Sequence, residues 1–154
     1  MNEKNLINTK LFLMSFFNLF SLVIILLSPI VYADSLLTVI VSKNSNIEEM
    51  SKKDVSRIFL SKTKELPNGQ KAITLEPNEI EYQEIFYEEV CEKTQQQLKK
   101  YWATVLFTGK GQPPRKMERI EDIIDFVKNN ENAIAYIPIS SLTSDDRKII
   151  SEIY

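Results

Sequence analysis

The pattern of apolar and polar positions predicts a chain of strands and helices in alternation. Residues 36–41, LLTVIV, are apolar on both alternating faces, which is typical of a strand covered on both sides. A second strand is expected at 71–76 and a third at 133–139, with Pro138 near its end. Because the intervening segments are long enough to cross over the sheet, the pattern favours a small, mainly parallel α/β sheet flanked by helices.

Capping residues and helical spacing predict where the helices begin. Ser51 with Asp54, and Thr94 with Gln97, have the spacing at which a side chain at each position can hydrogen-bond to the backbone of the other. Helices are expected from five places in the chain: after Ser51, after Pro77 to about residue 92, after Thr94, over 120–130, and after Thr143. The tripeptide at 67–69, PNG, predicts a turn before the second strand.

The stretch 101–114, YWATVLFTGKGQPP, runs from an amphipathic helix into a loop that contains two glycines. Positions at helical spacing form one apolar stripe: Leu98, Tyr101, Trp102, Val105 and Leu106. Phe107 is expected to end this helix. Gly109 and Gly111 permit positive φ, and the two prolines that follow impose an extended exit.

Two interpretations of the loop at 108–111 are open. Glycine followed by proline is a common helix end that needs no ligand. Consecutive backbone N–H groups beside Lys110 would instead favour an anion, although the G-x-x-x-x-G-K-[ST] spacing of a Walker loop is absent. The candidate ligand-binding residues are those of this loop and two asparagines near the ends of the first two strands: Thr108, Gly109, Lys110, Gly111, Asn44 and Asn78.

Composition argues against an enzyme and against a nucleic-acid-binding protein. The 154 residues include no histidine, so the commonest general base and any His-based metal site are lacking, and no cofactor is expected. The single cysteine, Cys91, cannot form an intramolecular disulfide and is expected to pack as a small apolar residue. Lys and Arg are scattered among Asp and Glu, with a formal net charge of −2, so no basic face for nucleic acid is expected.

The N-terminal segment has the features of a secretory signal peptide. Two lysines precede the apolar run at 11–27, and Val31-Tyr32-Ala33 provides small residues at the end of the segment. Cleavage after Ala33 would leave one exported domain, residues 34–154, in the periplasm or outside the cell. An uncleaved membrane anchor is the alternative, because the apolar run nearly reaches the span of a bilayer.

Several segments together carry a family resemblance. An IFL segment at 58–60, the pair Tyr101-Trp102, FTGKGQPP at 107–114 and AIAYIP at 133–138 occur in one order and spacing. In these features the chain resembles short secreted relatives of the phosphate-binding subunit of ABC transporters, over roughly residues 37–138. The resemblance implies a single lobe of a type II periplasmic-binding-protein-like fold, a small oxyanion or other polar solute as ligand, and an ABC permease as partner.

The resemblance also predicts that the phosphate contacts are replaced. In the family, the turn after the second strand and the start of the next helix bind the oxyanion through a Gly-Ser pair and an arginine. Alignment on Pro77 and Phe86 places Glu79, Ile80 and Gln83 at these positions. Losing the arginine and adding a facing carboxylate would cost about two to four decades of affinity, so little or no binding of inorganic phosphate is expected.

Two functions are open for a single lobe. A lobe offers half of a cleft, so solute binding would need a second copy, as in a homodimer, or another protein to complete it. The alternative is a non-catalytic protein–protein interaction module of the cell envelope, with four plausible contacts: Phe107, Lys110, Arg115 and Tyr136. Lys110→Glu distinguishes the two, because it would abolish anion binding in the first case and partner binding in the second.

Overall fold

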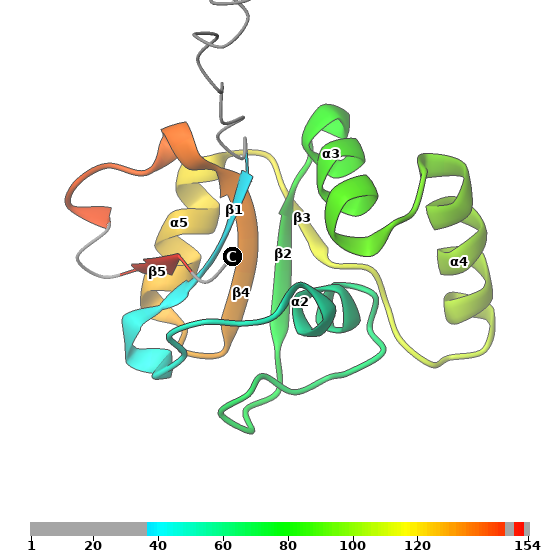
Figure 1. The fold of residues 1–154 in the computed structure, drawn as a ribbon, viewed down its shortest axis with the longest axis horizontal. Coiled ribbons are helices and arrows are strands. Elements are labelled where there is room, and N and C mark those ends of the chain that lie inside the picture. The colour runs from blue at the N-terminus through cyan, green and yellow to red at the C-terminus, as the bar shows by residue number, and fades with distance from the viewer. Residues whose placement is uncertain (1–36, 147–149, 153–154) are drawn as a thin grey trace, which may run out of the picture. The chain divides into compact units, whose positions relative to one another are not determined.

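Residues 37–146 and 150–152 are described by a computed structural model, and they form a five-stranded sheet with helices on both faces (Figure 1). The strands lie in the order β3-β2-β4-β1-β5. Their bounds are Leu37–Ser42 for β1, Ile73–Pro77 for β2, Arg115–Met117 for β3, Ala133–Pro138 for β4 and Ile150–Glu152 for β5. The expected α/β architecture and its three main strands are confirmed.

The direction of β1 differs from the expectation. β2 pairs in parallel with β3 and β4, as predicted, whereas β1 pairs antiparallel with both β4 and β5. The prediction of a mainly parallel sheet is therefore right for β2 and wrong for β1. A strand buried on both faces has the same apolar pattern in either direction, so periodicity carries no information about its sense.

The helices begin and end close to the expected residues. They are α2 (Lys52–Phe59), α3 (Ile80–Cys91), α4 (Gln95–Phe107) and α5 (Ile120–Asn129), with short 3-10 turns η1 (Lys43–Ser45) and η2 (Ile139–Ser141). Ser51 Oγ accepts a hydrogen bond from Asp54 N at 3.2 Å, and Thr94 with Gln97 forms a complete capping box. Thr143 and Asp146 also bond to each other as a cap, but most of the short helix expected after them lies outside the described residues.

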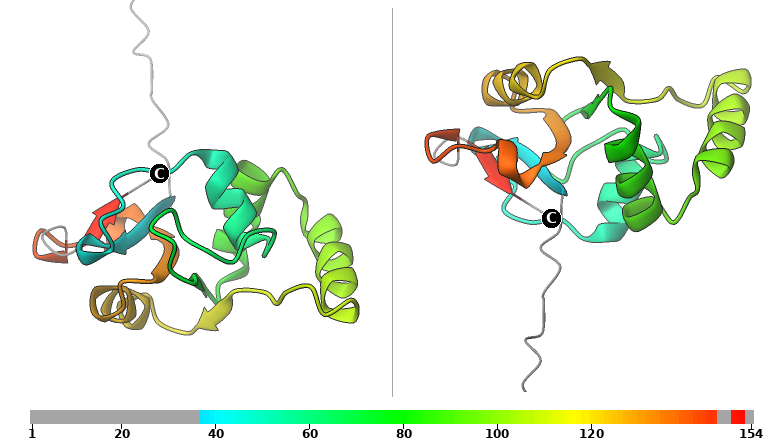
Figure 2. Two further views of the ribbon diagram at one scale, coloured as in Figure 1. Left: turned by 90° about the horizontal axis from the view of Figure 1, so that it is seen from below. Right: turned by 90° about the horizontal axis from the view of Figure 1, so that it is seen from above.

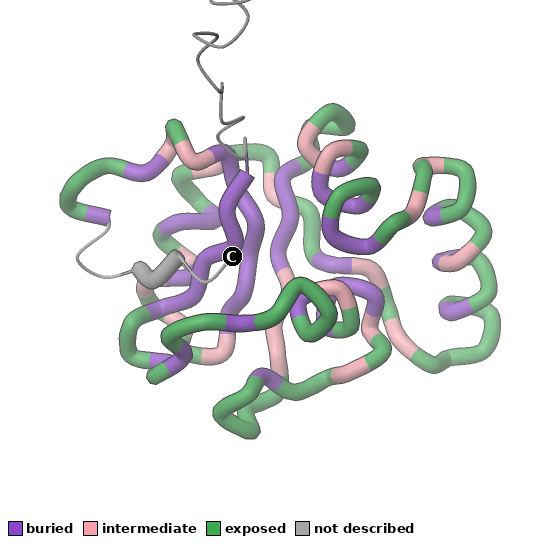
Figure 3. The backbone as a smooth tube through the Cα atoms, in the orientation of Figure 1, coloured by how far each residue is buried: buried purple, intermediate pink, exposed green. Residues whose placement is uncertain are grey.

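Two hydrophobic cores lie on opposite faces of the sheet. Val39 and Val41 of β1 point toward the side covered by α2 and α3, while Ile40 between them packs with Ile123 and Ile124 of α5 on the other side. Figure 2 shows α5 on one face, α2 and α3 on the other, and α4 beyond α3. Every residue of β1 and β4 is buried (Figure 3), which explains why both strands are predominantly apolar.

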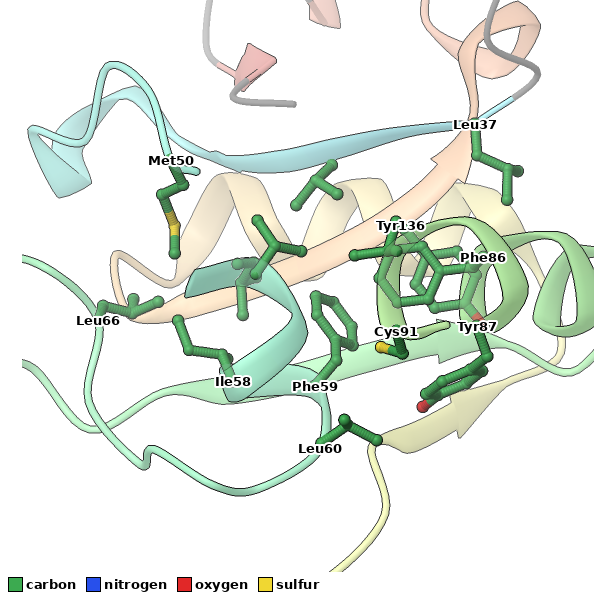
Figure 4. Close-up of a cluster of buried hydrophobic side chains, with 14 of the residues drawn as sticks. Leu37, Met50, Ile58, Phe59, Leu60, Leu66, Phe86, Tyr87, Cys91 and Tyr136 are labelled. Carbon is green, nitrogen blue, oxygen red and sulfur yellow. The ribbon is translucent and has the colours of Figure 1, made fainter. Parts of the chain in front are cut away.

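Aromatic side chains form the centre of the core beneath α2 and α3 (Figure 4). The rings of Phe86 and Tyr136 are stacked, with centroids 3.8 Å apart, and Phe59 meets Phe86 edge-on at 4.7 Å. Tyr136 is fully buried, so its expected role as a surface contact for a partner is wrong. Its place in an all-buried strand, β4, fixes it inside the domain.

The expectations for the N-terminus stay predictions. The signal peptide at 1–33 and the cleavage site after Ala33 lie outside the described residues. Within 37–146 and 150–152, no helix has the length and apolar character needed to span a bilayer.

Candidate functional site

The loop after α4 is built as a helix end. Lys110 N donates to Val105 O at 3.1 Å and Gly109 N donates to Leu106 O at 3.1 Å, which is the hydrogen-bond pattern of a Schellman motif. Gly109 adopts the left-handed conformation that this motif requires, with φ of +63°. These N–H groups donate to carbonyl groups of α4 and are not directed at a ligand. The backbone of the loop is therefore a common helix end, and not an anion-binding loop.

Gly111 is needed for a different reason from the one predicted. Its φ is not positive; instead, a Cβ at this position would lie 2.6 Å from Ser61 Cβ. Ser61 Oγ donates to Gln112 O at 2.8 Å, and Tyr101 OH donates to Leu60 O at 2.5 Å. The loop is thus held closely against the end of α2, and a side chain at position 111 would push the two segments apart.

A pocket of about 670 Å³ lies beside this loop. We call it the basic pocket; its lining comprises Ser61, Lys64, Lys71, Ala72, Ile73, Thr74, Gly109, Gly111, Gln112, Pro113 and Arg115. Lys64, Lys71 and Arg115 contribute three positive charges, and no Asp or Glu lines the pocket. None of these three cations has a carboxylate within 4.0 Å in the part of the chain that the structure describes. A pocket with one sign of charge attracts the opposite sign.

Local structure explains how the cations converge. Lys64 and Lys71 flank the turn at 67–69, where Gly69 N donates to Leu66 O, and Ala72 N donates to Lys64 O. Arg115 begins β3, which pairs in parallel with β2, and it lies opposite Leu75, two residues after the start of β2. The predicted turn already implied that Lys64 and Lys71 are neighbours, whereas nothing in the sequence showed that Arg115 would join them.

The candidate residues predicted from the sequence do not form one site. Val41 at the end of β1 and Thr74 near the start of β2 both lie opposite Ile134 of β4. Asn44, after β1, and Asn78, after β2, are therefore at opposite ends of the sheet. The geometric premise that they share a mouth with the loop is wrong, because it depended on a parallel β1.

Each candidate has local contacts. Asn78 Nδ2 donates to Glu118 Oε1 at 3.0 Å, and Asn44 N donates to Ser42 Oγ at 3.3 Å. Thr108 Oγ1 donates to carbonyls of α4, at 2.8 Å for Thr104 O. Of the six candidates, Gly109 and Gly111 line the basic pocket. Whether any of the six binds a ligand stays a prediction.

The positions expected to have lost their phosphate contacts gather at the start of α3. Glu79 is the N-cap residue without a side-chain cap bond, and Ile80 is 67% exposed. Gln83 is buried; its Nε2 donates to Pro77 O at 3.0 Å, and its Oε1 accepts from Lys116 Nζ at 3.1 Å. This end of the sheet is opposite to the basic pocket, so the mouth predicted from Asn44 and Lys110 does not include these residues.

A buried carboxyl group lies just before α3. Glu76 is 3% exposed, and its Oε2 accepts hydrogen bonds from Tyr87 OH at 2.9 Å and Tyr136 OH at 3.4 Å. Burial raises the pKa of the Glu76 carboxyl above its ordinary value near 4.5, and the hydrogen bond from Tyr87 and the charge of Lys116 offset this only in part. Burial and the neighbouring carboxylate in turn raise the pKa of both tyrosines.

Glu76 is expected to make stability depend on pH. Below about pH 4.5 the carboxyl is protonated in both states; as the pH rises, the unfolded chain loses this proton first, so the free energy of unfolding falls until the folded pKa is passed. Glu76→Gln should remove this dependence. Urea denaturation of both proteins at about pH 4 and about pH 7 checks it: the stability of the variant relative to the parent should increase with pH, and a constant difference would contradict the assignment.

Cys91 behaves as the sequence predicted. It is buried, and burial raises the pKa of its thiol, so the thiol is a poor nucleophile. Four cations line the surface beside it: Lys52, Lys53, Arg57 and Lys62. Glu92 lines the same surface, so these cations do not form a surface free of acidic groups. No group of three or more Cys, Asp or Glu residues suited to a metal ion occurs within the described ranges.

Comparison with known proteins identifies solved structures that share this fold. No known family model matches the chain, and no curated protein matches it in sequence. Among solved structures, a phosphate ABC transporter substrate-binding protein from Clostridium perfringens, determined with bound phosphate, is 18% identical with a TM-score of 0.58. A structure described as a possible phosphate binding protein from Planctomyces limnophilus is 11% identical with a TM-score of 0.56.

The chain has the fold of one part of these proteins. In both comparisons 76% of this chain is covered, but it spans only 43% and 40% of the other chains. The predicted α/β, periplasmic-binding-protein-like fold is therefore confirmed, and these structural neighbours are binding proteins rather than enzymes. Identities of this size show the fold alone, so the ligand has to be argued from the site.

Proposed function

We propose that this domain is a non-catalytic solute-binding module and that the basic pocket holds its ligand, a small polyanion. The convergence of Lys64, Lys71 and Arg115 in a pocket without a lining carboxylate carries this proposal. Hydrogen bonds between such cations and carboxylate or phosphate oxygens are about twice as strong as neutral ones. The likeness of the fold to solute-binding proteins supports a binding function rather than catalysis.

The size of the pocket indicates a ligand larger than inorganic phosphate. Its volume of about 670 Å³ lies within the range of roughly 300–1,000 Å³ that is usual for small-molecule sites. Three separate cations can be satisfied together by several anionic groups on one molecule. Ligands with several anionic groups on one small molecule include polycarboxylates, organic phosphates and condensed phosphates.

Inorganic phosphate itself is proposed to bind weakly. At the start of α3, the exposed Ile80 offers no hydrogen bond, and the Gln83 side chain is already bonded to Pro77 O and Lys116. A carboxylate at Glu79 would repel an anion at this place. The replaced contacts therefore support the reading that this module has departed from phosphate binding.

Export and assembly complete the proposal. The N-terminal sequence supports a periplasmic or secreted location after cleavage near Ala33. The chain spans less than half of the solute-binding proteins that share its fold. A second copy in a homodimer, or another protein, is proposed to provide the opposing wall of the cleft. An ABC permease is the partner that would receive the solute.

Calorimetric titration tests the ligand class. We expect citrate or pyrophosphate to bind at least about tenfold more tightly than inorganic phosphate, because they can reach more than one cation. This binding should weaken as salt is added. The comparison of citrate with pyrophosphate distinguishes a carboxylate site from a phosphate site. Micromolar binding of inorganic phosphate, or no binding of any of the three anions, would refute the proposal.

A protein-interaction module is the second candidate function. The large apolar side chains that are exposed in the described part of the chain are Ile80, Leu106 and Phe107. Two of them, Ile80 and Leu106, line a second groove, whose lining shares only Pro113 with the basic pocket. That groove carries a separate proposal.

A further inference from the structure

A groove of about 540 Å³ runs between α3 and α4. The two helices lie side by side in Figures 1 and 2, and Pro113 and Lys116 close the groove from the segment that leads into and through β3. Leu98, Trp102 and Leu106, three members of the predicted apolar stripe, line its α4 side. Leu98 and Trp102 are buried, but Leu106 is 55% exposed, so the stripe continues past the core into the groove.

The rim of this groove is apolar and open to solvent. Ile80 on α3 is 67% exposed and faces the same groove as Leu106 on α4. Burying such side chains against a partner would be favourable by about 25 cal/mol for each Å² of apolar surface removed from water. A small molecule would be enclosed by a tight site, whereas this open rim suits a longer segment that lies along the groove.

Polar groups in the groove indicate the chemistry of the segment. Gln95 lines the groove, but its Nε2 is buried below the surface, so a segment lying in the groove would not reach this atom. Lys99 and Lys116 also line the groove, and neither has a carboxylate within 4.0 Å in the described ranges. Glu84 is the one acidic residue that lines the groove, so the two lysines leave the lining with a net positive charge.

We propose that the groove between α3 and α4 binds an amphipathic, acidic segment of a partner protein. Apolar side chains of the segment pack against Ile80, Trp102 and Leu106. Its acidic side chains lie near Lys99 and Lys116. This surface is separate from the basic pocket, so the proposal does not depend on the ligand of that pocket.

Selection from a library of random short peptides displayed on phage, with the purified protein as bait, tests this site. We expect enrichment of sequences that combine Leu, Phe or Trp with Asp or Glu. Leu106→Glu should weaken the binding of the selected peptides at least about tenfold, because it places a carboxylate on the apolar rim. Thr104→Glu is the matched control: it places the same carboxylate on α4 at an exposed residue that does not line the groove, and should change binding less than about twofold.

A charge reversal provides a second measurement. Selection on Lys99→Glu should enrich Lys and Arg in place of Asp and Glu, an outcome that a purely structural role of Lys99 would not produce. Three results would overturn the proposal. They are the absence of any peptide sensitive to Leu106→Glu, Leu106-dependent binding of dodecanoate without any such peptide, and a homodimer that Leu106→Glu dissociates in sedimentation experiments.

Discussion

Phe86→Ala is expected to lower the free energy of unfolding by about 3–5 kcal/mol. Phe86 is 1% exposed, stacks on Tyr136 at 3.8 Å with an interplanar angle of 8°, and meets Phe59 edge-on at 4.7 Å. The truncation leaves a cavity between α3 and β4 and removes aromatic pairs that add about 0.5–1.5 kcal/mol beyond area burial. Since domains are stable by only about 5–15 kcal/mol, a large part of the total would be lost.

Urea denaturation measures this loss, and a second phenylalanine supplies the control. Phe107→Ala makes the same chemical change at a side chain that is 93% exposed, so it should alter stability by less than about 0.5 kcal/mol. Similar losses in the two variants would show that the packing of α3 on the sheet is not as described.

Arg115→Glu is expected to reduce the affinity for citrate or pyrophosphate by about 30-fold to 1,000-fold. Arg115 lines the basic pocket, with its guanidinium carbon 5.8 Å from the centre of the Phe126 ring, and losing one charge-assisted hydrogen bond costs about 1.5–3 kcal/mol. The new carboxylate adds repulsion of about 0.5–1 kcal/mol at a solvated position, for separations of roughly 4–8 Å. Together these terms correspond to about 2–4 kcal/mol, and calorimetric titration of the variant measures the result.

Lys100→Glu is the matched control for this charge reversal. Lys100 is exposed on α4 and does not line the basic pocket, so the same change in net charge should alter the affinity by less than about threefold. Equal losses in the two variants would mean that net charge, and not the pocket, attracts the anion. Lys110→Glu gives a third comparison, since Lys110 was a candidate from the sequence but does not line the pocket.

Local signals in the sequence predicted the elements well. Ser51 with Asp54 and Thr94 with Gln97 form the expected caps, and Gly109 has the positive φ that ends α4. These features depend on neighbouring residues alone, so a single sequence contains them. β3 was missed because Arg115–Met117 is short and polar, and its pairing with β2 supplies what its own residues do not.

Long-range features could not be predicted in the same way. The antiparallel direction of β1 depends on its pairing with β4, and it moves Asn44 and Asn78 to opposite ends of the sheet. Arg115 joins Lys64 and Lys71 through the pairing of β3 with β2. The resemblance to a known family predicted the type of fold, but it did not predict the position of these cations.

The pairing of β1 with β4 also has a consequence for biogenesis. Leu37 lies opposite Pro138, 138 − 37 = 101 positions later, and β4 stands between β1 and β2 in the sheet. The first two long strands to be synthesised are therefore not neighbours, and β1 cannot join β2 in one sheet until the ribosome has added β4. Such distant pairing is slow to form. The centre of the sheet therefore cannot be completed until most of the chain has been synthesised.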